Sequence, residues 1–122
     1  MQDFRKLHIY QKSIDYCSVI YKFSTKLPVH EKYGLISQIK RAASSISLNI
    51  SEGAGSATKK EFAQFITYSY RSVNEVLTCL ELIKKLNLLD EAHELNSLEQ
   101  DGIELSRMIY RFFVSLGGKT FI

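Results

Sequence analysis

Apolar residues recur every three or four positions along almost the whole 122-residue chain, and this rhythm strongly restricts the folds open to it. Side chains at such spacing share one face of an α-helix, whereas a half-buried strand alternates apolar and polar residues. The rhythm predicts four helices, over residues 4–27, 31–52, 59–86 and 91–116. The expected core stripe of the first helix is Leu7, Tyr10, Ile14, Cys17 and Tyr21, widened by Ile20, Phe23 and Leu27. That of the third helix is Phe62, Ile66, Ser69, Val73, Val76, Leu80 and Ile83.

Residues that favour helix ends separate these segments. Pro28 is expected to end the first helix, because the residue before a proline is pushed out of the α region. The glycine-rich run 53–56 and the pair Gly117–Gly118 are expected to end the second and fourth helices, since glycine readily adopts the left-handed C-terminal cap.

Residues that favour helix starts stand at matching places. Asp3 and Asp90 are expected to cap the first and fourth helices, because a short carboxylate side chain can accept a free backbone N–H. Thr58 and Glu61 have the spacing of a capping box at the start of the third helix.

Short connections between long helices force neighbouring helices to run antiparallel. The chain contains six glycines and one proline and shows no linker, repeat or low-complexity tract. With 45% apolar residues, it is long enough to enclose one core. The sequence therefore predicts an all-α protein, a single antiparallel up-down-up-down four-helix bundle spanning residues 1–122.

The apolar runs and the cysteines indicate the cellular compartment. No apolar run approaches the 18 or so residues of a membrane span, and no apolar segment follows the charged N-terminus as in a secretory signal. Cys17 and Cys79 are too widely separated in sequence to form a metal knuckle and too few for a disulfide framework. We expect a reduced, cytoplasmic protein without a membrane partner.

Charge is distributed unevenly along the chain, although the formal net charge is only +3. Residues 1–60 carry ten basic and four acidic groups, whereas residues 61–106 carry three basic and nine acidic groups. Such asymmetry is compatible with a face that binds a polyanion. It is also compatible with basic and acidic helices that pack together within or between subunits, and we slightly favour this second interpretation.

Residues with the spacing of a catalytic or metal site are missing. His8, His30 and His93 lie on three different segments, and the Glu-x-x-His pairs of di-iron bundles do not occur. The glycines at 53 and 55 are not followed by the Gly-Lys-Ser/Thr of a phosphate-binding loop. We expect no enzyme, no catalytic residue, no metal and no cofactor; the enzymatic alternative is a site built where subunits meet.

A row of long polar side chains on the second helix is not explained by the helix's own core. On a helical wheel its members fall within an arc of about 80°; they are Gln38, Arg41, Ser45, Asn49 and Glu52. Ser72 and Glu75 lie on a similar flank of the third helix. Arg41 is expected to reach Glu75, and Glu52 to reach Lys59 or Lys60. These groups either latch one chain together or serve a second subunit or ligand, and we favour an interface.

The same residues carry a family resemblance. One motif resembles the signature of the four-helix-bundle proteins encoded in 23S rRNA intervening sequences. It is the run Glu31-x-Tyr33-x-Leu35-x-x-Gln38-x-x-Arg41-Ala42-x-x-Ser45-Ile46-x-x-Asn49-Ile50-x-Glu52-Gly53. Their relatives include the accessory variability determinant of diversity-generating retroelements. Ser72-x-x-Glu75 and Phe4-x-x-Leu7 fit the same pattern. Two departures are Arg71, where a small residue is expected, and the absence of a tryptophan after Leu7.

The resemblance implies an antiparallel four-helix bundle that assembles as a ring-like homopentamer with a non-enzymatic role. It also implies a basic surface, because the retroelement relatives bind nucleic acid and a reverse transcriptase through one. We therefore expect a homo-oligomeric scaffold that binds RNA or DNA without reading sequence. Candidate phosphate-binding residues are Lys40, Arg41, Lys59, Lys60 and Arg71, extended by Lys12, Lys22 and Lys26. The alternative is a protein-interaction hub that binds a reverse transcriptase or neighbouring gene product and no nucleic acid.

Overall fold

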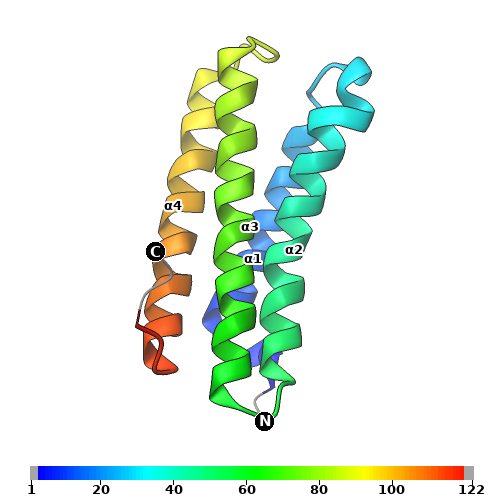
Figure 1. Cartoon of the computed structure of the whole chain (residues 1–122). Coiled ribbons are helices and arrows are strands. Elements are labelled where there is room, and N and C mark those ends of the chain that lie inside the picture. Colours follow the sequence, from blue (N-terminus) through cyan, green and yellow to red (C-terminus); the bar gives the residue numbers. More distant parts are fainter. Residues whose placement is uncertain (1–2, 120–122) are drawn as a thin grey trace.

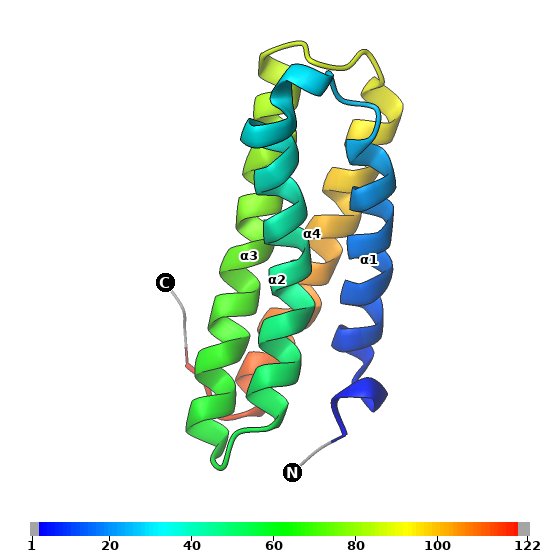
Figure 2. The ribbon, with the colours of Figure 1, turned by 90° about the vertical axis from the view of Figure 1, so that its right-hand side faces the viewer.

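The computed structural model describes residues 3–119, apart from the side chain of Tyr33. It contains four α-helices, α1 (His8–Ser24), α2 (Ser37–Ala54), α3 (Lys59–Lys85) and α4 (Ala92–Ser115). The helices lie side by side with their long axes roughly aligned, and the chain reverses direction at each connection (Figures 1 and 2). No strand occurs within residues 3–119, so the predicted all-α class is confirmed.

All four helices contribute to one apolar core. Each helix packs along its neighbour in the chain, most extensively α2 on α3, whereas α1 and α4 meet more sparsely. Fully buried side chains include Ile20, Phe23, Ile39, Ile46, Ile66, Leu80, Leu98 and Ile109. Within the described part of the chain, no helix combines the length and hydropathy that a membrane span requires.

The core face of α1 differs from the predicted stripe. Ile14 and Tyr21 are 43% and 41% exposed, whereas Ser13 and Tyr16 point inward and are buried. Ser13 tolerates this position because its hydroxyl donates to the Tyr10 carbonyl oxygen at 2.7 Å. The regular part of the predicted stripe is therefore wrong by about one position, since residues with satisfied hydroxyl groups occupy part of the core face. Ile20, Phe23 and Leu27, predicted to widen the stripe, are buried as expected.

The first helix also starts later than expected. Phe4–Lys6 form a 3₁₀ turn, and Asp3 caps this turn by accepting the Arg5 backbone N–H at 3.1 Å. Leu7 is extended and precedes α1, so Asp3 does not cap the α-helix itself. Asp90 does not cap α4 either, because the residue before Ala92 is Glu91, which makes no side-chain cap bond.

The connection from α1 to α2 is longer than predicted. After Pro28 the chain forms a 3₁₀ turn over Val29–Glu31 and a π-helical turn over Lys32–Ile36. Gly34, inside the π turn, has non-helical dihedral angles of φ −105° and ψ −111°. A regular α-helix therefore begins only at Ser37, not at residue 31.

Left-handed residues end two of the helices. Gly117, with φ +91°, follows α4 as predicted, and the N–H of Gly118 donates to the Phe113 carbonyl oxygen at 3.1 Å. Asn87, with φ +52°, has the same role after α3. Gly55 has φ −84°, so the left-handed cap predicted after α2 is wrong.

At the start of α3, Thr58 accepts the Glu61 N–H at 3.1 Å, which confirms the first half of the predicted capping box.

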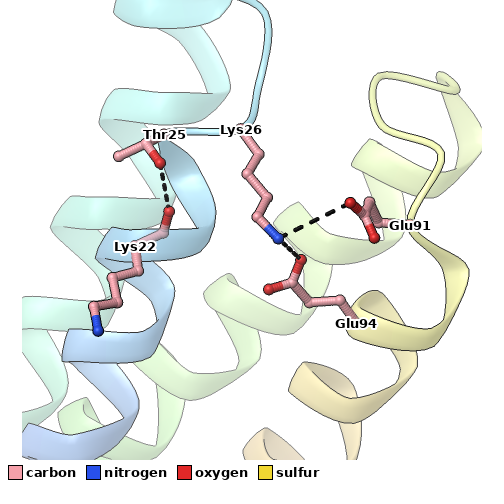
Figure 3. Close-up of polar contacts among 5 residues, drawn as sticks. All are labelled: Lys22, Thr25, Lys26, Glu91 and Glu94. Carbon is pink, nitrogen blue, oxygen red and sulfur yellow. Dashed lines mark hydrogen bonds and ion pairs between the residues drawn. The ribbon is translucent and has the colours of Figure 1, made fainter.

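An ion pair joins the end of α1 to the start of α4. The Lys26 amine lies 2.7 Å from a carboxylate oxygen of Glu94 and 4.0 Å from Glu91. Figure 3 shows the amine reaching toward both carboxylates while the Thr25 hydroxyl donates to the Lys22 carbonyl. The hydrogen bond to Glu94 raises the pKa of Lys26 above its ordinary value.

Candidate functional site

Two members of the predicted polar row on α2 meet the polar flank of α3, and a third, Asn49, supports one of them. The hydroxyl oxygens of Ser45 and Ser72 are 2.9 Å apart. The Gln38 amide donates to a Glu75 carboxylate oxygen at 3.3 Å. Asn49 donates to both the carbonyl and hydroxyl oxygens of Ser45, at 2.8 and 3.0 Å. We call these five residues the polar seam.

A buried hydrogen bond lies beneath the polar seam. The Ser69 hydroxyl donates to the Ile46 carbonyl oxygen at 2.8 Å, and both residues are fully buried. A serine at this position lets α3 approach the α2 backbone closely, because its side chain is short and its polar group is satisfied. Sequence reasoning assigned Ser69 to the apolar stripe; a serine in an otherwise unbroken apolar row is the signal that points to such a contact.

Arg41 and Glu52 lie outside the polar seam. Both are exposed, and within the described residues neither forms an ion pair within 4.0 Å. The expected ion pair of Arg41 with Glu75 is therefore not formed in the single chain. Arg41 lies on the same side of the helix as Gln38 and Ser45, one turn from each. Its side chain is exposed and does not take part in the seam.

Exposed apolar side chains flank the polar seam. Leu48 is 63% exposed and lies three residues after Ser45 on α2. Tyr68 is 38% exposed and lies four residues before Ser72 on α3. Residues three or four apart on a helix are surface neighbours, so each side chain lies one turn from the seam. The outer face of α2 and α3 thus combines hydrogen-bonding and apolar groups.

The five candidate phosphate-binding residues do not form one patch. Lys60 and Arg71 line the same groove, between α3 and the C-terminal end of α4. Lys59 lines a separate hollow beside Ala54, Thr58 and Phe112. The structure thus brings together two of the three candidates on α3.

The other two candidates lie on different sides of α2. The Lys40 amine is 4.8 Å from the centre of the Tyr21 ring, where α1 meets α2. Arg41 lies on the outer side next to the polar seam. A cation above a ring face is attracted to it, so Lys40 already has an intramolecular partner.

The remaining reactive side chains are buried or unclustered. Burial raises the pKa of the Cys17 and Cys79 thiols, with Glu75 adding to the shift at Cys79, and both cysteines are free. Burial also raises the pKa of the Tyr16 phenol. Within residues 3–119 no group of three or more His, Cys, Asp or Glu side chains could hold a metal ion. The absence of an enzymatic activity stays a prediction.

Comparison with known proteins supports the resemblance. A solved crystal structure of a protein with unknown function from the S23 ribosomal protein family, from Bacteroides thetaiotaomicron VPI-5482, is similar in fold, with a TM-score of 0.77. It shares 21% sequence identity and covers 86% of this chain and 97% of its own. No curated protein sequence matches. The family profile of 23S rRNA-intervening sequence proteins matches residues 5–111, and the chain therefore belongs to that family.

Proposed function

We propose that the chain is the subunit of a non-enzymatic homo-oligomeric scaffold that binds RNA or DNA without reading sequence. Its helices form an up-down-up-down bundle, and the subunits close into a ring-like homopentamer in the cytoplasm. The observation that carries the proposal is the outer face of α2 and α3, where the polar seam, the solvent-facing Arg41 and the exposed Leu48 lie side by side. No cofactor is required for such a role.

Contact with a second subunit would let the groups on this outer face contribute more to stability. Hydrogen bonds and ion pairs on an exposed surface contribute only about 0–1 kcal/mol, because water competes for the same groups. If a neighbouring chain covered the seam, water would no longer compete for its hydrogen bonds, and Leu48 would bury apolar area. Arg41 could then form a two-pronged pair with a carboxylate of the neighbour.

Repetition of weakly basic subunits in a ring would favour the binding of nucleic acid. One chain has a formal net charge of only +3, which is low for a dedicated nucleic-acid protein. A ring presents each basic residue once per subunit, and linked weak contacts add up to useful affinity. Contacts to phosphates carry no sequence information and weaken as salt rises, because they release condensed counterions.

The direct test is fluorescence anisotropy with labelled RNA and DNA at low and physiological salt, with the solution mass measured on the same sample. The proposal expects an oligomer whose binding falls steeply with salt. A monomer would contradict the scaffold role, and an intact oligomer that binds neither polymer at low salt would contradict the nucleic-acid role.

A protein-interaction hub is the second candidate function. Val29 is 82% exposed and Leu86 is 56% exposed. Their two connections lie at the same end of the molecule (Figure 2). Apolar groups gathered there would suit a protein partner better than a polyanion. Capture of a defined protein partner, with an affinity that survives reversal of the lysine charges, would favour this function over nucleic-acid binding.

A further inference from the structure

An open groove of about 440 Å³ separates the first half of α3 from the C-terminal end of α4. Its α3 wall carries Lys60, Gln64, Thr67 and Arg71, at steps of four, three and four residues, so all four share one helix face. At 1.5 Å per residue, Lys60 and Arg71 lie about 16 Å apart along the helix axis. The groove therefore has a cation toward each end of this wall.

Two glycines form part of the opposite wall, beside Phe113 and Leu116. Gly117 and Gly118 line the groove, and a Cβ atom at Gly118 would come within 2.2 Å of the Phe113 ring. Gly117 has φ +91°, a conformation that favours glycine. Because the two glycines have no side chains, a ligand can approach the backbone closely at these positions.

The chemistry of the groove suits an extended anion. Of its described lining residues only Lys60 and Arg71 are charged, and no carboxylate opposes them. The Thr67 hydroxyl already donates to the Ala63 carbonyl oxygen at 3.0 Å. The Gln64 amide is therefore the uncharged side-chain donor between the two cations.

We infer that this groove is the track along which one phosphate backbone strand of RNA or DNA binds each subunit. The inference rests on the proposed nucleic-acid binding and names its location. The two cations lie far enough apart along the groove to engage different phosphates of the same strand. The Phe113 ring is only 7% exposed and lies under Gly118, so the groove has no platform for stacking bases. Binding there is independent of sequence.

The test compares two double variants that remove the same charge. Lys60→Gln with Arg71→Gln empties the groove of cations, and both side chains are exposed, so folding is retained. Lys85→Gln with Arg107→Gln is the matched control, because both side chains are exposed, Lys85 ends α3, Arg107 lies on α4, and neither lines the groove. Anisotropy titrations use duplex DNA, single-stranded RNA and polyglutamate as separate probes, and solution mass confirms that each variant assembles like the wild type.

Loss of two phosphate contacts lowers the slope of log affinity against log salt by about two per engaged subunit. Over a fourfold rise in salt, wild-type affinity then falls about tenfold more than that of the groove variant, and the control variant behaves as the wild type does. The charge-conserving pair Lys60→Arg with Arg71→Lys retains binding.

Three results would overturn the inference. If the groove variant binds as tightly as the wild type, or both double variants weaken equally, nucleic acid binds elsewhere and the proposed function survives without this site. If polyglutamate binds the wild type as strongly as RNA or DNA and loses affinity in the groove variant, the groove serves an acidic protein. If the wild type binds no nucleic acid at low salt, the proposed function fails together with the inference.

Discussion

The phenolic oxygen of Tyr16 in α1 lies directly over Gly102 in α4. A Cβ atom at position 102 would come within 2.6 Å of this oxygen and 2.8 Å of Leu77. Tyr16 is buried, and its hydroxyl donates to the Leu98 carbonyl oxygen at 2.9 Å, so the ring cannot swing aside without losing that bond. Gly102 is therefore the residue that lets α1 and α4 meet.

We expect Gly102→Ala to destabilise the fold, because overpacking a core usually costs about 1–3 kcal/mol. The gain of about 1 kcal/mol that alanine brings to a helix offsets only part of this cost, so the expected net loss is up to about 2 kcal/mol. Tyr16→Phe alone should cost about 1 kcal/mol through the lost hydrogen bond. Urea unfolding of both single variants and the double variant measures the coupling. Since removing the hydroxyl relieves the closest contact, strictly additive losses would contradict this arrangement.

Tyr16 also predicts a loss of stability at alkaline pH. Burial, with smaller contributions from Asp101 and Glu99, raises its pKa in the folded state above the ordinary value of 10.0. The unfolded phenol ionises first, so the stabilisation is complete below pH 10 and declines as pH rises from there toward the folded pKa. Urea unfolding at about pH 8 and about pH 11 should show a smaller decline in the free energy of unfolding for Tyr16→Phe than for the wild type. The half-buried Tyr10, changed to Phe, is the control and should keep the decline.

Two glycines at the turn between α2 and α3 predict opposite effects of alanine. A Cβ atom at Gly53 would lie 2.7 Å from Phe65 and 2.9 Å from Phe62, so Gly53→Ala should destabilise by about 1–3 kcal/mol. At Gly55 the nearest atom would be 3.5 Å away and φ is −84°, so Gly55→Ala should stabilise by about 0.4–1 kcal/mol. Thermal and urea unfolding measure both. Stabilisation by Gly53→Ala would refute the close approach.

The interiors of the helices could be read from the sequence because packing and apolar period agree there. The predicted stripe of α3, from Phe62 to Ile83, is buried throughout. On α1 the regular stripe was predicted about one position off, because Ser13 and Tyr16 enter the core with their hydroxyl groups satisfied by backbone carbonyls. A pattern that counts only apolar residues cannot find a buried serine such as Ser13.

The connections and the pairing of α2 with α3 depend on tertiary contacts. The irregular turn at Gly34 and the left-handed Asn87 follow from how the helices meet and not from a local apolar period. The polar row on α2 was found from the sequence, but its partners on α3 depend on the helix register. The close approach of Gly53 to Phe62 and Phe65 fits this register, and spacing alone does not reveal it.

The polar seam predicts that two adjacent cations on α2 differ in what they stabilise. Arg41→Ala should lower the oligomer mass but barely change the unfolding free energy of the isolated subunit, because Arg41 is exposed and forms no ion pair within the described residues. Lys40→Ala, the matched control, should keep the oligomer mass and cost the subunit about 0.5–1 kcal/mol through its lost contact with Tyr21. Sedimentation and urea unfolding separate the two effects. Equal oligomer masses for both variants would contradict the assignment of Arg41 to the contact between subunits.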